Sequence, residues 1–241
     1  MQGLLKFFYA VGLIVILAGC KGKVESIKDS YWFVDKSITI GKALDGYKYF
    51  ESKKWEIVKT ENGREFVDFT GVVSTAETSK NIDGPINNAR SKDPSVDTAM
   101  ASDAEKAALY QGFGIGGAFF AAQNMHKLEY LVGSDVKKYI SNNGRYALKI
   151  RFKYDKDNKE KERSINVDQF ALVEVPSGTI VNDGMNQNEV LTNVYGEKQL
   201  FGKDGLDGDP YWIIGLNKFK GNVEKALQNA AADAQKHLFG Q

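Results

Sequence analysis

Residues 146–154 alternate between apolar and mostly basic side chains, with the two-residue period of a half-buried β-strand. The apolar positions are Tyr146, Leu148, Ile150, Phe152 and Tyr154, and the others are Ala147, Lys149, Arg151 and Lys153. A strand with one apolar face belongs in an antiparallel sheet that buries one side. The charged segment 155–163 leads to another strand pattern at 164–175, which predicts a long antiparallel hairpin. Asp168 and Gln169 interrupt the alternation there and predict a bulge.

Residues 55–71 predict a second hairpin, with its turn at Asn62 and Gly63. A two-residue loop would mix apolar and polar side chains on one face of the hairpin. A three-residue loop, with Gly63 in the left-handed conformation, gathers four apolar side chains on one face. Because a slip of one residue moves each side chain to the other face, we predict the three-residue loop. Its register places Trp55 opposite Phe69, Ile57 opposite Val67 and Lys59 opposite Glu65.

Three segments have helical patterns bounded by capping residues. The first helix carries Ile40, Ala43 and Leu44, is capped by Ser37 or Thr39 and stops at Asp45-Gly46; the second runs from about Asn186 to Tyr195 and stops at Gly196; the third starts at a capping Asn222 and stops at Gly240. Residues 210–216, PYWIIGL, predict a buried strand.

The middle of the chain has a different composition. Residues 74–98 are polar, rich in turn-forming residues and without a sustained period, which predicts a long loop or a disordered stretch. Helical composition begins at Thr98, so we interpret residues 74–135 as a partly helical insertion in a single domain that spans 37–241. The fold class predicted is α+β, an antiparallel sheet of at least four strands with packed helices.

The first twenty residues carry a targeting pattern. An apolar run of thirteen residues, Phe7–Gly19, follows Lys6 and fits a secretory signal, because a membrane span needs about 18 residues or more. The run ends in Leu17-Ala18-Gly19-Cys20, which resembles the lipobox of bacterial lipoproteins: an aliphatic residue, two small residues and the cysteine that is lipidated. The alternative interpretation is a buried free cysteine in an N-terminal helix.

The resemblance to bacterial lipoproteins implies processing at these positions. It implies cleavage between Gly19 and Cys20, loss of the signal peptide 1–19, and a diacylglyceryl group on the Cys20 thiol, with a further chain such as palmitate on the new amine. Two or more acyl chains hold a protein durably on a membrane without a transmembrane helix. Residues 20–36 are then expected to form a lipidated tether, which gives way to the first buried aromatic residues within YWFV at 31–34. Lys21 implies the outer membrane in a Gram-negative host, or the outer face of the plasma membrane in a Gram-positive one.

A second resemblance concerns the fold alone. Residues 184–196, GMNQNEVLTNVYG, together with the strand that begins at Trp55, resemble parts of the small helix-plus-sheet lipoproteins of outer-membrane assembly. Gly184, Met185, Val190 and Gly196 carry the likeness to the opening helix of those proteins. The resemblance implies a small envelope domain and says nothing specific about a site.

Charge and cysteine content exclude several classes of partner. Without residues 1–19 the chain keeps 31 basic and 31 acidic side chains, whereas nucleic acid or anionic lipid as the main partner demands a basic excess. Cys20 is the only cysteine, so its acylation leaves no thiol for a disulfide or a thiolate metal site. We therefore expect no nucleic-acid partner and no cofactor.

Two short motifs suggest chemistry that their context does not support. Gly112, Gly114 and Gly117 satisfy G-x-G-x-x-G, but a dinucleotide fingerprint follows a strand, and these glycines follow a helical pattern. The small residues of 112–122 fit close packing against a helix or a membrane surface instead. Ser134 and Lys137 match S-x-x-K, the spacing of penicillin-recognising enzymes, without the K-T-G strand that accompanies it.

Acidic and imidazole side chains offer only weak candidates. Asp204, Asp207 and Asp209 supply enough oxygen ligands for calcium but lack the EF-hand spacing, so an ordinary turn is the simpler interpretation. His126 and His237 are the only histidines, and neither has a partner at the spacing of a zinc site.

These observations predict a lipid-anchored cell-envelope protein of the binding or assembly type, with a protein partner and without an identifiable catalytic site. A small-ligand-binding lipoprotein is the alternative, and an envelope enzyme comes third. A closed apolar cavity lined by the aromatic residues of 146–154 and 211–212 would favour the ligand. An exposed apolar patch would favour a protein partner.

Overall fold

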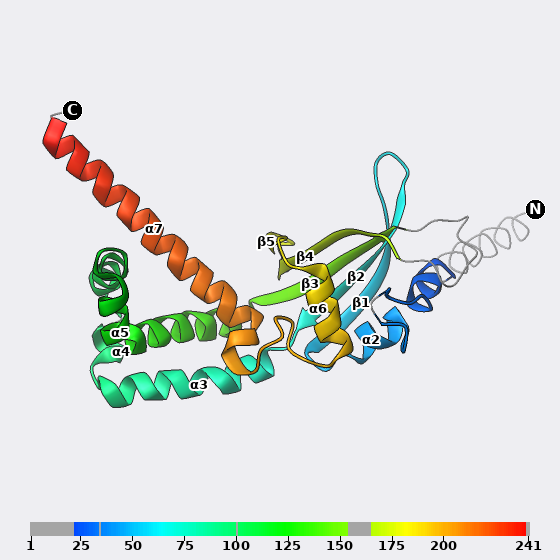
Figure 1. Ribbon diagram of the computed structural model, residues 1–241, viewed down its shortest axis with the longest axis horizontal. Helices are drawn as coiled ribbons and strands as arrows, with labels where there is room; N and C mark the ends of the chain where they lie inside the picture. Colours follow the sequence, from blue (N-terminus) through cyan, green and yellow to red (C-terminus); the bar gives the residue numbers. More distant parts are fainter. Residues whose placement is uncertain (1–21, 34, 100, 154–164, 240–241) are drawn as a thin grey trace, which may run out of the picture. The chain divides into compact units, whose positions relative to one another are not determined.

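The computed structural model describes residues 22–33, 35–99, 101–153 and 165–239. These residues form two compact units (Figure 1). Unit 1 comprises Met1–Ser74 and Arg145–Gly202, and unit 2 comprises Thr75–Gly144 and Lys203–Gln241. This division differs from the expectation of one domain with an insertion at 74–135, because the C-terminal helix packs with the middle of the chain in unit 2.

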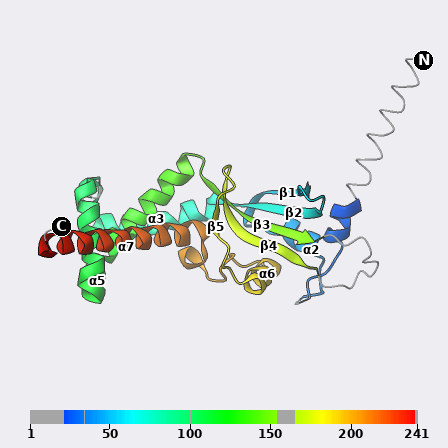
Figure 2. The same cartoon turned by 90° about the horizontal axis from the view of Figure 1, so that it is seen from above.

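Unit 1 is built on a five-stranded antiparallel sheet, which confirms the predicted α+β class and the sheet of at least four strands. Its strands are β1 (Phe50–Lys59), β2 (Glu65–Val73), β3 (Arg145–Lys153), β4 (Val167–Val175) and β5 (Ile180–Asn182). They lie in the order β1-β2-β3-β4-β5 (Figure 2). The chain leaves the sheet after Val73 and re-enters it at Arg145, at the end opposite the β1–β2 turn.

The β1–β2 hairpin has the predicted register. Trp55 pairs with Phe69, Ile57 with Val67 and Lys59 with Glu65. Gly63 has a φ of +79°, the left-handed conformation that the three-residue loop requires. The rings of Trp55 and Phe69 meet at 4.8 Å on the apolar face, so side-chain pairing selects the register.

The β3–β4 hairpin is also confirmed, with its bulge. Arg151 pairs with Gln169 and the next residue, Phe152, pairs with Val167, which leaves Asp168 as the extra residue. The buried side of β3 carries the apolar residues expected from the alternation: Tyr146, Leu148, Ile150 and Phe152.

Two predicted helices of unit 1 form with their expected caps and contact each other on one side of the sheet (Figure 1). In α2 (Ile40–Gly46) the Thr39 hydroxyl accepts a hydrogen bond from the Lys42 amide at 3.3 Å. In α6 (Gln187–Tyr195) the Asn186 side chain caps the first turn and Gly196 is the C-cap. Ile40, Leu44, Val190 and Val194 are among the buried residues that these helices add to the core.

The expected tether at 20–36 is wrong over the part that the structure describes. Residues 22–28 form a helix, and Tyr31 pairs with Thr39 in an isolated bridge. Ile27 and Trp32 are buried, at 6% and 1% exposure. The burial of Trp32 agrees with the expectation that buried aromatic residues begin in this stretch, whereas the helix at 22–28 and the burial of Ile27 replace the expected tether.

Unit 2 is helical in all of its described residues that form regular structure. Its elements are α3 (Thr75–Lys92), α4 (Val96–Ala99), α5 (Asp103–Ser141), the 3₁₀ helix η1 (Gly205–Gly208) and α7 (Pro210–Phe239). α5 packs against both α3 and α7. A Cβ on Gly133 would lie 3.1 Å from Ile86 of α3, and one on Gly215 would lie 2.9 Å from Val136 of α5. Glycines therefore allow close approach at both helix contacts.

The loop predicted at 74–98 is wrong, because most of it is helix α3. The buried residues of α3 are Thr78, Ile82, Ile86 and Ala89, which recur at the helical period. Gly84 and Pro85, two of the turn-forming residues of this segment, both lie within α3. This buried stripe is narrow, and two of its four residues, Thr78 and Ala89, are only weakly apolar. Packing against α5 therefore stabilises a helix that the local sequence favours only weakly.

The strand predicted at 210–216 is also wrong, since these residues begin helix α7. The third predicted helix does not start at Asn222, which lies inside the same continuous helix. Asp209 and Pro210 occupy the N-cap and first helical positions. A buried helix start is apolar on all sides, so its sequence resembles that of a buried strand.

Helix α5 changes direction sharply along its length (Figures 1 and 2). In a straight helix, residues eight apart are separated by about 12 Å along the axis. A Cβ on Gly112 would nevertheless lie 2.2 Å from the ring of Phe120, so the helix bends between them. The bend falls in the glycine-rich segment, where helix propensity is lowest.

Candidate functional site

The strongest site predicted from the sequence, Cys20 with the cleavage position after Gly19, lies outside the described residues. The described chain begins at Gly22, two residues after Cys20. Among the described helices, none combines the length and apolar character that crossing a bilayer requires. The described structure nearest to Cys20 is therefore the helix at 22–28 with its contacts.

The helix at 22–28 is fixed to the rest of unit 1 at both ends. Lys23 forms an ion pair with Glu65, the first residue of β2. Lys28 Nζ lies 2.9 Å from Asp45 Oδ2, at the end of α2. A Cβ on Gly41 would stand 2.6 Å from Cβ of Lys28, so α2 and this helix meet at near-backbone distance. Folded structure thus begins immediately after the predicted anchor.

A second group of polar side chains lies on the sheet face opposite the aromatic core. Asp68 on β2 is 0% exposed, and Arg151 on β3 pairs with it side by side. Arg151 Nε and Nη2 donate to the two Asp68 carboxylate oxygens, each at 2.7 Å. Lys149 Nζ lies 3.6 Å from the same carboxylate. The buried carboxylate therefore lies between two cations.

The chemistry of this cluster is that of a satisfied ion pair. The carboxylate of Asp68 raises the pKa of Arg151, mainly through their hydrogen bonds. The Arg151 guanidinium also lies over the ring of Phe66 at 5.3 Å. Neighbouring charges on the sheet pair in the same way, Lys153 with Asp168 at 3.2 Å and Lys54 with Glu56 at 2.7 Å. The Asp68 carboxylate has both of its oxygens paired with cations, which indicates a structural role for the group.

The three aspartates weighed as calcium ligands do not converge. Asp209 caps α7, accepting hydrogen bonds from the amides of Tyr211 at 2.8 Å and Trp212 at 3.2 Å. Asp204 is the N-cap residue of η1 and Asp207 lies in its first turn. Within the described ranges, no three acidic, histidine or cysteine residues come close enough to hold a metal ion.

Asp209 is the buried carboxylate of unit 2. It is 3% exposed and accepts a hydrogen bond from the hydroxyl of Thr78, which is fully buried in α3. Burial raises the pKa of Asp209 above its usual value, and the hydrogen bonds from Thr78 and the two amides oppose that shift. The carboxylate joins the start of α7 to α3 rather than facing solvent.

The S-x-x-K residues have separate partners. Ser134 hydrogen-bonds the hydroxyl of Tyr130, one turn earlier in α5. Lys137 forms an ion pair with Asp83 of α3. A serine nucleophile needs the lysine beside it, and here each side chain has another partner.

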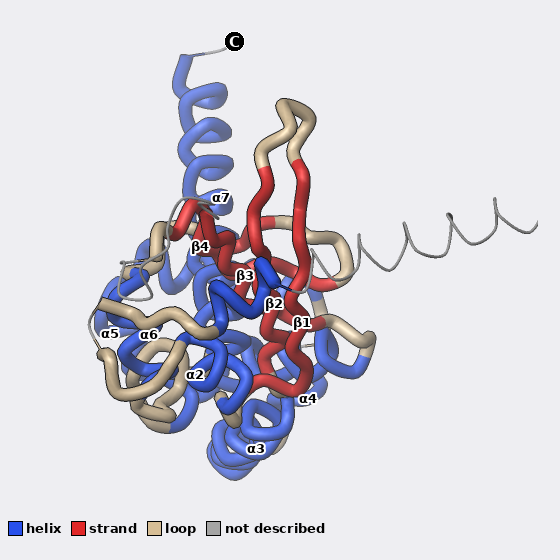
Figure 3. The backbone as a smooth tube through the Cα atoms, turned by 90° about the vertical axis from the view of Figure 1, so that its right-hand side faces the viewer, coloured by secondary structure: helices blue, strands red, loops and turns tan. Residues whose placement is uncertain are grey.

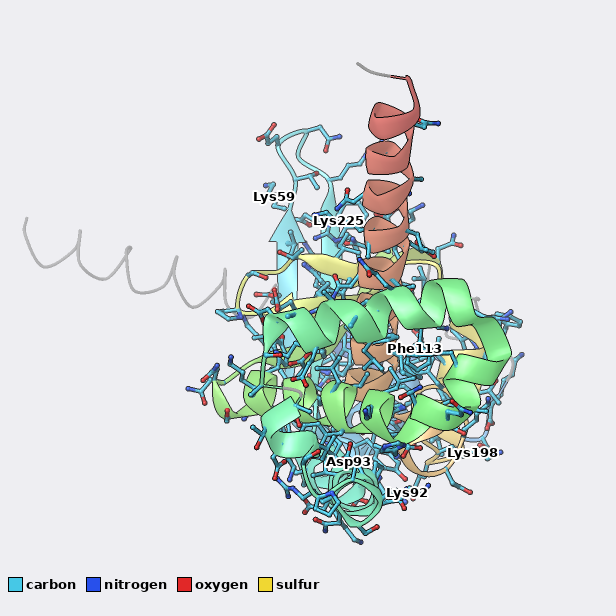
Figure 4. The ribbon with its side chains drawn as sticks, turned by 90° about the vertical axis from the view of Figure 1, so that its left-hand side faces the viewer. Lys59, Lys92, Asp93, Phe113, Lys198 and Lys225 are labelled. Carbon is cyan, nitrogen blue, oxygen red and sulfur yellow. The ribbon has the colours of Figure 1, made fainter. Side chains whose placement is uncertain are left out.

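The glycine motif lies inside a helix on both sides, not between a strand and a helix, so the dinucleotide interpretation is wrong. The side chains of residues 114–119 are outside what the structure describes. Next to them, the ring of Phe113 meets Phe120 at 5.5 Å and Phe219 of α7 at 5.4 Å (Figure 4). The small-residue segment therefore allows the bend that brings these rings together.

The histidines have no catalytic or ligating arrangement that the structure describes. His126 lies near Asp93, whose pKa is lowered mainly by the hydrogen bond from Ser95, with a smaller effect of Lys127 and His126. The side chain of His237 lies outside the described set.

Sequence reasoning missed the Asp68–Arg151 pair. The signal was present, because Asp68 is the one acidic residue in the apolar run FVDF and the β3 pattern has a basic face. Register between β2 and β3 could not be derived without knowing that seventy-one residues separate the two strands as a second unit.

Comparison of the chain with protein-family models, with curated proteins and with solved structures finds no match in any of the three.

Proposed function

We propose that this protein is a lipid-anchored component of the bacterial cell envelope that binds or assembles with other envelope proteins. The observation that carries the proposal is the sequence Leu17-Ala18-Gly19-Cys20 directly after a thirteen-residue apolar run. Acylation of Cys20 would hold the protein at the membrane without a transmembrane helix.

One feature of the described residues and one of the sequence support a binding role. The polar groups that the sheet gathers, Asp68 with Arg151 and Lys149, are committed to one another. The chain without residues 1–19 has balanced charge, which suits a partner that is neither nucleic acid nor a strongly acidic surface.

The ligand-binding alternative has weaker support. A cavity lined by the aromatic residues of 146–154 and 211–212 would favour a ligand, but the described members of this set with the closest ring contacts are packed within their own units. Phe152 is 1% exposed and stacks on Trp55 at 5.9 Å, and Tyr211 is 1% exposed with Tyr139 at 6.4 Å. Side chains with such close aromatic partners serve as core residues.

Replacement of the cysteine tests the proposal. Cys20→Ala should abolish metabolic incorporation of a labelled fatty acid and leave a precursor that keeps residues 1–19, because the acceptor thiol is missing. Lys21→Ala, a change at the neighbouring position, should still be labelled and processed. Continued labelling of Cys20→Ala would remove the anchor and with it the proposed function.

A further inference from the structure

The distance between the predicted anchor and the folded chain is short enough to fix how unit 1 meets the membrane. One residue, Lys21, separates Cys20 from Gly22, so their Cα atoms are at most about 7 Å apart. The tether expected from the sequence, residues 20–36, could have reached roughly 55–60 Å if extended. Headgroup regions are only about 5–8 Å thick on each side of the hydrocarbon. Gly22 therefore lies within about one headgroup layer of the lipidated residue.

Gly22 is a fixed point on unit 1 because the helix that it begins is docked. Ile27 is buried, Lys28 pairs with Asp45, and α2 approaches Lys28 so closely that a Cβ on Gly41 would stand 2.6 Å from it. A docked helix transmits the position of the anchor to the whole unit.

The Lys23–Glu65 ion pair shows which end of the sheet lies next to the start of the 22–28 helix. Glu65 is the first residue of β2 and directly follows the β1–β2 turn. Lys59, Glu61 and Arg64 are exposed on the two sides of that turn. The turn stands clear of the other strands, and Lys59 lies beside it (Figures 3 and 4).

We propose that this end of unit 1 rests directly on the phospholipid headgroups of the membrane that holds Cys20. It comprises the start of the 22–28 helix, Lys59 at the end of β1 and the β1–β2 turn at residues 60–64. The inference rests on the lipid anchor proposed above. The exposed Lys59 and Arg64 provide an ammonium and a guanidinium for headgroup phosphates, and a guanidinium binds phosphate with two parallel hydrogen bonds. The 31 basic and 31 acidic side chains of the chain without residues 1–19 give no net charge that would orient the protein on the membrane, so the short anchor and this end determine the orientation.

Lipid quenching of a fluorophore at two matched positions tests the orientation. Acylation occupies the only native cysteine, so an introduced cysteine is the single free thiol of the full lipidated chain. Glu61→Cys places the label in the β1–β2 turn, and Ser177→Cys places it in the exposed turn after β4, at the other end of the sheet. Strands of nine residues separate the two ends by about 30 Å.

The labelled proteins are reconstituted into vesicles of phosphatidylethanolamine and phosphatidylglycerol that contain a lipid with a nitroxide on its headgroup. We expect loss of fluorescence at position 61 and none at position 177. Insertion of about ten glycine and serine residues between Lys21 and Gly22, which adds roughly 35 Å of reach, should remove the difference.

Three results would overturn the inference: equal quenching at both positions, quenching at neither position, or a difference between the positions that remains after the insertion. In each of these cases, protein bound to the vesicles through its acyl chains would still support the anchor. Protein that carries no acyl chains and stays out of the vesicle fraction would contradict the proposed function itself, and the inference with it.

Discussion

At the scale of single residues, unit 1 depends on one buried carboxylate. Asp68 is fully buried and Arg151 is 20% exposed, so the pair is largely removed from water. Such a pair offsets its own desolvation through two parallel hydrogen bonds, but it leaves a costly charge behind when one partner is removed. The intact pair therefore adds little net stability, whereas removal of one partner lowers the free energy of unfolding.

Removal of the Asp68 charge should destabilise unit 1. Asp68→Asn leaves the Arg151 guanidinium without its anion, and the free energy of unfolding should fall by about 3 kcal/mol. Lys54→Gln, which breaks the exposed pair with Glu56, should change it by less than about 1 kcal/mol. Chemical denaturation of both variants measures the difference. Equal effects of the two changes would contradict the structural role assigned to Asp68.

Asp209 makes the stability of unit 2 depend on pH. Its pKa is raised in the folded state, so the folded form holds the proton more tightly than the unfolded form. The stability contributed by this group is greatest below the unfolded pKa, about 3.9, and falls as pH rises through the raised folded pKa. Ionisation at neutral pH thus opposes folding, while the N-cap hydrogen bonds favour it.

Two replacements separate these effects. Asp209→Ala removes the cap and leaves the buried Thr78 hydroxyl without its acceptor, so the free energy of unfolding should fall by about 2–3 kcal/mol. Asp209→Asn keeps a good N-cap and cannot ionise, so its stability relative to the natural chain should be more favourable at pH 7 than at pH 4. Urea titrations at the two pH values measure both. A relative stability of the Asn variant that does not change with pH would contradict the raised pKa.

At the scale of elements, the sequence predicted those elements that depend on neighbouring residues and not those that depend on contacts between distant segments. The β1–β2 hairpin was predicted with its register because local side-chain pairing and Gly63 determine it. Helix α3 and the start of α7 were not predicted, because their helices depend on contacts with α5 that local patterns do not contain. Asp209-Pro210 was the local signal that could have identified α7, as an N-cap followed by proline at the first position.

The contact between α2 and the 22–28 helix can be tested with two glycines of the same helix. Gly41→Ala would place a methyl group 2.6 Å from Lys28 Cβ and 3.0 Å from its Cα, so the free energy of unfolding should fall by about 1–3 kcal/mol. Gly46→Ala meets no atom within 4 Å and should be neutral or stabilise by up to about 1 kcal/mol. Denaturation curves of the two variants decide, and a harmless Gly41→Ala would contradict the docking of the first helix.

At the scale of the whole molecule, the two units combine sequence segments that no local pattern connects. Unit 2 is completed by residues 203–241, so the segment interpreted as an insertion is one part of a helical unit to which the C-terminal helix also belongs. The candidate sites differ in the same way in how far the sequence predicts them. Cys20 was predicted from a local motif, because the expected peptidase and acyl-transfer steps need only neighbouring residues. The Asp68–Arg151 pair could not be predicted, because it depends on the register of β2 and β3, which are far apart in the sequence.

Acylation of Cys20 underlies the proposed membrane attachment, and the intact mass of the protein extracted from membranes tests it most directly. We predict a chain that begins at Cys20, without residues 1–19, and that carries the added mass of a diacylglyceryl group on the sulfur. A chain that still contains its first nineteen residues and an unmodified thiol would contradict the account.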